Sequence, residues 1–378
     1  MQRHIQQDLA RKRKRMFIIL GIILVLIVAI VLRLVQNFSA SSEITAVQLP
    51  ISASYKIVPF GKNVLYYDGM NLNCITPTGA TRWQIALGHD ADFDTNGTSI
   101  VAWSNTQIYV IDGNGNPTHT DNLDSPIQFA RIGEKYVGMI TGEDSSPHLY
   151  ITDLNGQYID REHNAYEGYL LLNIGFFGDQ DRYMWSLSFD VKGSVPDTIL
   201  TTFQVGQKNT GSLSLGDALV RAVLYDNANL RVINTRQMRT FDYRGTENIQ
   251  EAFLVYGWTL IDSHLPEKGS LSLLFAPSQQ TSTQYRINEL RVISGAMDIR
   301  YTLPSTCVGA TVVGKSVYAF GGEYIYKAEV KADNSAQRFT PISMPSNVPG
   351  IPTDFLGATT DNVALIAFNN DIYALKLP

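Results

Sequence analysis

The chain has 378 residues, of which 44% are hydrophobic and 17% are charged. This length and apolar content exclude a disordered chain and predict at least one large folded core. The formal net charge of −5 is unevenly distributed: residues 1–33 hold seven basic side chains and one acidic one, which leaves a net charge of −11 in the other 345 residues. Because an acidic body repels phosphate, this distribution excludes a nucleic-acid-binding protein.

A basic run followed by an apolar stretch lies near the N-terminus. Residues 11–15 read RKRKR, and residues 16–32 contain no charge. We interpret residues 1–15 as a basic cytoplasmic tail and residues 16–35 as one transmembrane helix, because about 20 apolar residues span a bilayer. Positive charge before the span keeps the N-terminus inside. The pattern therefore predicts a single-pass cell-membrane protein with an extracytoplasmic C-terminal domain.

The alternative reading of this segment is a cleaved signal peptide, which also has a basic start and an apolar centre. Its nearest approach to a cleavage site is Ser39, Ala40 and Ser41. The apolar stretch is longer than a usual signal core, so an uncleaved anchor is the favoured interpretation.

Residues 36–48 are rich in Ser and Thr and predict a stalk that enters a closing strand, and residues 49–378 predict one all-β domain. In this domain short strands recur in pairs. The second strand of each pair is predicted at residues 72–75, 108–111, 149–152, 238–241, 290–293, 325–328 and 372–375. An apolar strand precedes most of them, at residues 64–67, 100–103, 136–140, 183–187, 317–320 and 363–368.

Turn sequences such as DGNG at residues 112–115 and DLNG at residues 153–156 follow several of these strands. The predicted turns are on average about 43 residues apart, which is the length of one four-stranded propeller blade. They lie near Gly79, Gly115, Gly156, Gly206, Gly245, Gly295 and Asp333, and the chain end is counted as the last position. The period predicts a β-propeller of seven or eight blades, and eight is favoured. The weakest repeats are the one around Gly206 and residues 248–282.

The last predicted strand, residues 371–378, has no later strand to complete its blade. Residues 44–50 could supply the missing strand from the N-terminal side, which would close the ring without an open sheet edge.

Two short motifs resemble ligand sites, but a structural explanation fits each better. Residues 309–316, GATVVGKS, match the phosphate-loop pattern G-x-x-x-x-G-K-[ST]. A strand and a turn follow them, so no helix N-terminus would hold a phosphate, and we expect no nucleotide. Residues 92–97, DFDTNG, begin like a calcium loop, but Trp103 stands at the twelfth position, where such a loop needs Glu. A strand-connecting turn is expected there.

Other residues that carry chemistry are scattered. Cys74 and Cys307 fall in separate repeats, so we expect buried free thiols. The six histidines show no zinc-binding spacing, and no serine-nucleophile motif is present. We therefore expect no catalytic residues, no cofactor-binding residues, no metal site and no cofactor.

One stretch of the sequence resembles a repeat of the pyrroloquinoline-quinone-type propellers. It comprises Tyr66, Tyr67, Asp68 and Gly69, then residues 72–75, Thr78, Gly79 and Trp83. That repeat occurs in quinoprotein dehydrogenases and, without cofactor, in envelope scaffold proteins such as the outer-membrane assembly lipoprotein. The resemblance implies that Trp83 packs between adjacent blades. The paired cysteines and metal carboxylates of the dehydrogenases have no match here. Overall the chain resembles uncharacterised single-pass, membrane-anchored propeller proteins of Gram-positive bacteria with WD40-like repeats.

Three functions are compatible with these observations. The favoured one is a non-enzymatic scaffold or binding module for an envelope protein or wall component. The second is glycan or small-ligand binding at the propeller funnel, with residues 163–169 and 179–185 as candidate loops. The third is a hydrolase or lyase whose carboxylates come from separate blades. No nucleic-acid or nucleotide partner is expected.

Overall fold

The computed structural model describes residues 44–144, 146–162, 166, 168–207, 209–226, 229–265, 271–278, 286–331 and 339–378. The predicted cytoplasmic tail, transmembrane helix and most of the predicted stalk lie outside these residues, as does Asp333. None of the helices in the described ranges is long and apolar enough to cross a membrane. Thr45–Leu377 form one compact unit, to which the following description applies.

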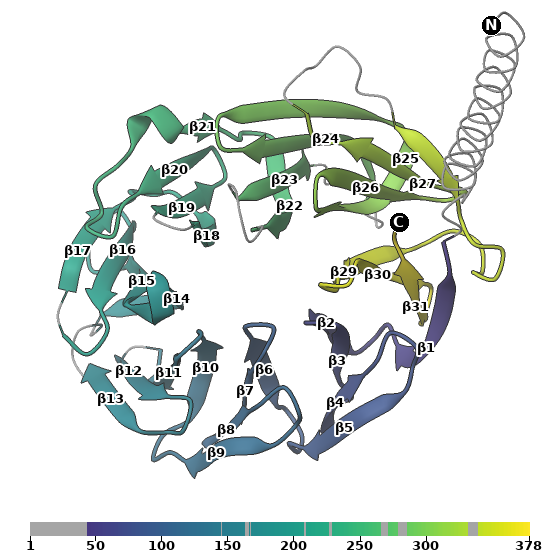
Figure 1. Cartoon of the computed structure of the whole chain (residues 1–378). Coiled ribbons are helices and arrows are strands. Elements are labelled where there is room, and N and C mark those ends of the chain that lie inside the picture. Colours follow the sequence, from purple (N-terminus) through teal and green to yellow (C-terminus); the bar gives the residue numbers. More distant parts are fainter. Residues whose placement is uncertain are drawn as a thin grey trace, which may run out of the picture. The chain divides into compact units, whose positions relative to one another are not determined.

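The unit consists of antiparallel strands arranged in a ring of separate sheets, with β2, β6, β10, β14, β18, β22 and β29 facing the centre (Figure 1). Five sheets are four-stranded meanders, which we call blades 1 to 5. Blade 1 contains β2 (Lys56–Phe60), β3 (Asn63–Tyr67), β4 (Asn71–Ile75) and β5 (Thr81–Ala86). Blade 2 contains β6 (Asp92–Thr95), β7 (Ile100–Ser104), β8 (Gln107–Ile111) and β9 (Pro117–Asn122).

The next three blades continue in chain order. Blade 3 contains β10 (Ile127–Ile132), β11 (Tyr136–Glu143), β12 (Ser146–Asp153) and β13 (Tyr158–Glu162). Blade 4 contains β14 (Tyr169–Phe177), β15 (Tyr183–Asp190), β16 (Asp197–Gln204) and β17 (Asn209–Ser214), with the 3₁₀ turn η1 (Asp179–Asp181) between β14 and β15. Blade 5 contains β18 (Val220–Asp226), β19 (Asn229–Asn234), β20 (Gln237–Phe241), η2 (Ile249–Glu251) and β21 (Phe253–Leu254).

Two blades are fused through one long strand. The seven-stranded sheet contains β22 (Trp258–His264), β23 (Ser272–Pro277), β24 (Ile287–Ser294), β25 (Met297–Val313), β26 (Ser316–Gly321), β27 (Tyr324–Glu329) and β28 (Thr340–Ser343). The first part of β25 pairs with β24 and the last part pairs with β26, and Cys307 has a partner on each side. The strand is therefore the outermost strand of blade 6 and the innermost strand of blade 7.

Blade 8 closes the ring with strands from both ends of the unit. It contains β29 (Asp354–Ala358), β30 (Val363–Phe368), β31 (Asp371–Lys376) and β1 (Ala46–Ser52). In the antiparallel ladder Ala46 lies opposite Leu375 and Leu49 opposite Ile372. The predicted closure is confirmed, and the described strands form eight four-stranded units, the larger of the two predicted numbers. The closing strand begins at Ala46, inside the segment predicted as stalk.

The strands predicted from the sequence are confirmed as the second and third strands of the blades. The paired predictions correspond to β3 with β4, β7 with β8, β11 with β12, β26 with β27 and β30 with β31, and the strands predicted at residues 183–187, 238–241 and 290–293 are β15, β20 and β24. Both faces of these strands are covered by neighbouring blades, so they read as continuous apolar runs; in β30 all six residues are buried. Each fully buried Val, Leu, Ile or Phe side chain in these strands contributes about 1.5–3 kcal/mol of burial free energy.

Adjacent blades are joined at their outer turns. Trp83 on β5 donates a hydrogen bond from Nε1 to the carbonyl oxygen of Gly113 (3.2 Å), in the turn between β8 and β9. The expectation that Trp83 packs between blades is confirmed. The weakest predicted region, residues 248–282, includes β21, which has only two residues and leaves blade 5 with a short outer strand.

Candidate functional site

The inner turns of successive blades gather around a concave surface near the centre of the ring. It has a volume of about 450 Å³, and we call it the central depression. Its lining comes from five blades and comprises Asn96, Gly133, Glu134, Phe176, Phe177, Gly178, Asp179, Gln180, Asp181, Tyr225 and Leu265. Ligand sites occur preferentially in such concave regions with a few convergent polar groups.

The loop of η1 enters the depression in a strained conformation. Gln180 (φ 54°) and Asp181 (φ 57°) both adopt left-handed backbone, which costs on the order of 1–2 kcal/mol per non-glycine residue. The carboxylate of Asp181 offsets this cost, because its Oδ2 accepts hydrogen bonds from the backbone N–H groups of Lys135 (2.7 Å) and Tyr136 (3.3 Å) in blade 3. These hydrogen bonds hold the loop of blade 4 against blade 3.

Gly133 belongs to the same contact between blades 3 and 4. A Cβ atom added to Gly133 would overlap the carboxylate of Asp181. The carbonyl oxygen of Gly133 also accepts a hydrogen bond of 2.6 Å from Nδ2 of Asn96 in blade 2. Three neighbouring inner turns are therefore linked in series, which gives the depression a defined shape.

The depression places carboxylates beside the half-buried side chain of Tyr225, and the ring of Phe177, which is 3% exposed, packs against Tyr225 in the core. Burial raises the pKa of Asp181, opposed by the backbone hydrogen bonds, and the charge of Glu134 raises it further. Burial also raises the pKa of Tyr225, with additional contributions from Asp226 and Asp179. The rings of Phe177 and Tyr225 have centroids 5.5 Å apart. Aromatic faces and carboxylates both attract cations. No basic residue is among the described lining residues, but the ammonium group of Lys135 stands beside them and donates to Oε1 of Gln180 (2.6 Å).

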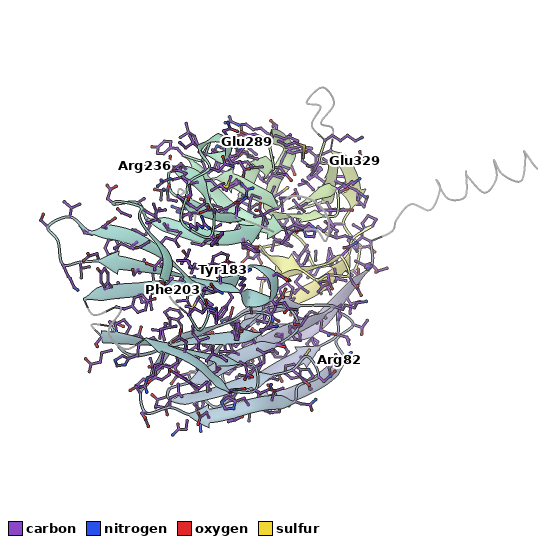
Figure 2. All side chains as sticks on the ribbon, turned by 60° about the vertical axis from the view of Figure 1, so that its left-hand side comes forward. Arg82, Tyr183, Phe203, Arg236, Glu289 and Glu329 are labelled. Carbon is purple, nitrogen blue, oxygen red and sulfur yellow. The ribbon has the colours of Figure 1, made fainter. Side chains whose placement is uncertain are left out.

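The structure separates the two loops that the sequence suggested as parts of one funnel. Of residues 179–185, Asp179, Gln180 and Asp181 line the central depression, whereas Trp185 is buried in the core. From the other loop, residues 163–165 and 167 lie outside the described residues. Tyr166 and Tyr169 line a different hollow of about 210 Å³ on blade 4. Figure 2 shows Tyr183 and Phe203 on neighbouring strands of that blade.

The residues of the two rejected motifs have structural roles. Residues 309–316 form the end of β25, a turn at Gly314 (φ 59°) and the start of β26. The strand and turn predicted to follow the motif are confirmed as β26 and the turn before β27. Asp92 forms an ion pair with Lys56, and Oδ2 of Asp94 accepts a hydrogen bond from the backbone N–H of Ile132 in the next blade (3.0 Å). Residues 92–97 form β6 and the turn after it, as expected.

The two cysteines are buried free thiols, which confirms the prediction. Burial raises the pKa of Cys74 to about 11 and that of Cys307 to about 12, so both are protonated at neutral pH. Across the described ranges, no group of three or more His, Cys, Asp or Glu side chains is arranged to hold a metal ion.

Sequence reasoning missed Asn96, Glu134 and Tyr225 as residues of one site. Each stands in or beside the inner turn of a different blade, and no linear spacing connects them. The third hypothesis requires carboxylates from separate blades, and the depression does bring Glu134 of blade 3 together with Asp179 and Asp181 of blade 4.

No protein family and no curated protein matches the chain by sequence. Among solved structures it is similar to BamB from Moraxella catarrhalis, with 10% identity, 88% of this chain and 98% of that chain covered, and a TM-score of 0.50. It is also similar to Kluyveromyces lactis Hsv2 with loop 6CD replaced by a Gly-Ser linker, with 9% identity, 77% and 98% covered, and a TM-score of 0.50. The unit is a β-propeller. At these identities the likeness establishes the fold alone.

Proposed function

We propose that this protein is a membrane-anchored, extracytoplasmic β-propeller that acts as a non-enzymatic scaffold in the cell envelope, and that its central depression binds a basic segment of a partner protein. The observation that carries the proposal is the combination, in one concave surface, of Glu134 and Asp179 with the half-buried side chain of Tyr225.

The chemistry of the depression favours Lys or Arg side chains as its occupants. Their aliphatic stems pack on aromatic rings while the charged heads reach carboxylates. Cation–π contacts are worth about 0.5–2 kcal/mol each, with more when desolvated, so two or three basic side chains would give a specific but reversible complex. A volume of about 450 Å³ has room for such side chains.

The three carboxylates of the depression do not have the same role. Asp181 accepts two backbone N–H groups of blade 3, which makes it a structural carboxylate. Glu134 and Asp179 are therefore the two carboxylates assigned to the ligand. No cofactor is part of the proposal.

The membrane placement is supported by the sequence of residues 1–35, in which RKRKR precedes an uncharged stretch. The body of the chain carries a net charge of −11, which agrees with a basic partner. Envelope proteins are the expected partners because an anchored ectodomain meets them at the membrane surface.

Site-specific photo-crosslinking in membranes tests the proposal. A photoreactive amino acid replaces Leu265, at the depression, or Tyr256, which is exposed outside its lining. We expect a discrete crosslinked product from position 265, none of the same size from position 256, and loss of the product in Glu134→Gln/Asp179→Asn. A product that survives removal of both charges, or one formed equally at both positions, contradicts the proposal.

A further inference from the structure

Both faces of blade 4 contribute apolar side chains to a core cluster, but small hydroxyl residues interrupt the face toward blade 3. The face toward blade 5 is apolar and contributes Trp185, Leu187, Leu200 and Leu213 to one cluster. The cluster toward blade 3 contains Leu171, Ile174 and Met184, together with Phe203. On that second face, small hydroxyl residues follow one another across neighbouring strands: Ser186 pairs with Thr201, and Thr201 pairs with Ser212.

These small residues leave a hollow of about 210 Å³. It is lined by Tyr166, Tyr169, Ser188, Ile199, Thr201, Phe203 and Ser212. Ser188 is 3% exposed, so this polar side chain lies well inside the blade. A large apolar residue at these strand positions would fill the space and stabilise the blade, as Leu187 and Leu200 do on the other face.

Aromatic side chains complete the wall of the hollow. The hydroxyl of Tyr166 lies 3.0 Å from Oγ of Ser186 and shares a buried hydrogen bond with it. The ammonium group of Lys192 stands 4.8 Å from the centre of the Tyr169 ring, which holds that ring in place by a cation–π contact. The lining thus combines rings held in place with hydroxyl groups from three neighbouring strands.

We propose that this hollow binds one ring of a neutral glycan. A sugar ring has an apolar face that packs on aromatic side chains and hydroxyl groups that both donate to and accept from Ser and Thr. None of the described lining residues is charged, which favours a neutral ligand, and the nearby ammonium of Lys192 disfavours a cation. The hollow, about 210 Å³ in volume, has room for one six-membered ring.

This site is separate from the central depression in its residues and in its chemistry. It goes beyond the proposed function, which concerns a basic protein segment held by Glu134 and Asp179. An anchored propeller with both sites would hold a protein partner and a neutral wall or surface glycan at once.

An array of neutral and acidic glycans, probed with the detergent-solubilised full chain, tests the proposal. The informative variant is Thr201→Val/Ser212→Val, because valine removes the hydroxyls and favours a strand. The matched control is Thr120→Val, on the exposed outer strand of blade 2. We expect binding to neutral glycans that falls at least tenfold in the double variant and is unchanged in the control.

A second variant, Tyr169→Ala at the rim, keeps the test decisive if the double variant fails to fold; we expect the same tenfold loss. Absence of neutral-glycan binding by the unsubstituted chain, equal binding of acidic glycans, or retention of binding in a folded hollow variant would overturn the proposal. The crosslink from position 265 is expected to persist in these variants, so failure of one site is distinguishable from failure of the other.

Discussion

Nε1 of Trp83 donates a hydrogen bond to the carbonyl oxygen of Gly113, and the indole of Trp83 covers Gly115 in the same turn of the next blade. Equivalent turns receive similar bonds further round the ring. Thr118 Oγ1 donates to the carbonyl of Leu154 (2.8 Å), and Thr210 Oγ1 to that of Tyr243 (3.2 Å). The second residue of each turn therefore accepts a side-chain hydrogen bond from the preceding blade, which couples neighbouring blades at their outer edges.

This relationship predicts the effect of Gly115→Ala. Gly115 has φ 84° and no space for a Cβ beside Trp83, whereas Gly97 has φ 87° and open space around it. Gly97→Ala should cost about 1–2 kcal/mol from backbone strain alone, and Gly115→Ala about 1–3 kcal/mol more from overpacking. Equilibrium unfolding in urea measures both.

A double-mutant cycle separates overpacking from strain. A Trp83→Ala background removes the indole atoms but keeps the Cβ of residue 83, 2.9 Å from the position of the new Cβ, so Gly115→Ala should cost less there than beside Trp83. Equal costs for Gly115→Ala with and without Trp83 would show that the indole does not constrain this turn.

Ring closure predicts different effects for proline at two neighbouring positions of β1. The backbone N–H of Lys376 donates to the carbonyl of Thr45, so alternation along the ladder directs the N–H of Val47, opposite Ala374, toward β31 and that of Gln48 toward solvent. Val47→Pro should destabilise the propeller by about 1–3 kcal/mol through an unpaired buried carbonyl. Gln48→Pro should cost less, because edge strands tolerate proline at outward positions. A larger loss of free energy of unfolding for Gln48→Pro would contradict the assigned closure.

From the raised pKa of Asp262 we expect a free energy of unfolding that falls as the pH rises. Burial raises its pKa above the ordinary 3.8, although Thr311 Oγ1 (2.7 Å) and the N–H of Val312 (3.2 Å) in blade 7 donate to its carboxylate. A carboxyl whose folded pKa is raised binds more protons in the native state, so its charged form opposes folding above that pKa. Asp262→Asn should therefore be more stable than the unsubstituted chain at pH 7, and this advantage should shrink toward pH 4. Denaturation curves at pH 4, 5.5 and 7 measure it; a variant that is less stable at pH 7 would refute the argument.

The Arg291–Asp298 pair predicts the opposite pH dependence. Nε and Nη2 of Arg291 each lie 2.8 Å from a carboxylate oxygen of Asp298, and Nη1 donates to the carbonyl of Leu254 in blade 5 (2.6 Å). These hydrogen bonds, opposed by burial, lower the pKa of Asp298. The stabilisation is therefore present above the unfolded pKa and is lost as the pH falls through the lowered value.

Arg291→Met should lower the free energy of unfolding by about 2–3 kcal/mol at pH 7, less than for a fully buried pair because Asp298 is partly exposed. The difference from the unsubstituted chain should decrease in acid. Arg300→Met is the matched control, since Arg291 and Arg300 both lie over the ring of Trp258 and only Arg291 makes the bidentate pair with Asp298. Equal destabilisation by the two variants would count against the role assigned to Arg291.

The sequence by itself determined the architecture of the propeller, because local sequence patterns specify its hairpins and the spacing between them. Turn chemistry at Gly79, Gly115 and Gly156 and the apolar runs before it specify hairpins, and their period specifies the blade. The closing strand was predicted because residues 44–50 could complete the blade that contains residues 371–378. Trp83 was placed between blades through its resemblance to a known repeat.

Only the tertiary structure decided where the candidate sites lie. Glu134, Asp179 and Tyr225 are far apart in sequence and meet because inner turns of successive blades share one end of the ring. Residues 163–169 and 179–185 were expected in one funnel, yet their described residues line two separate surfaces. The physical reason is that a propeller site is assembled from short turns around a closed ring, so its chemistry depends on which turns become neighbours and not on spacing along the chain.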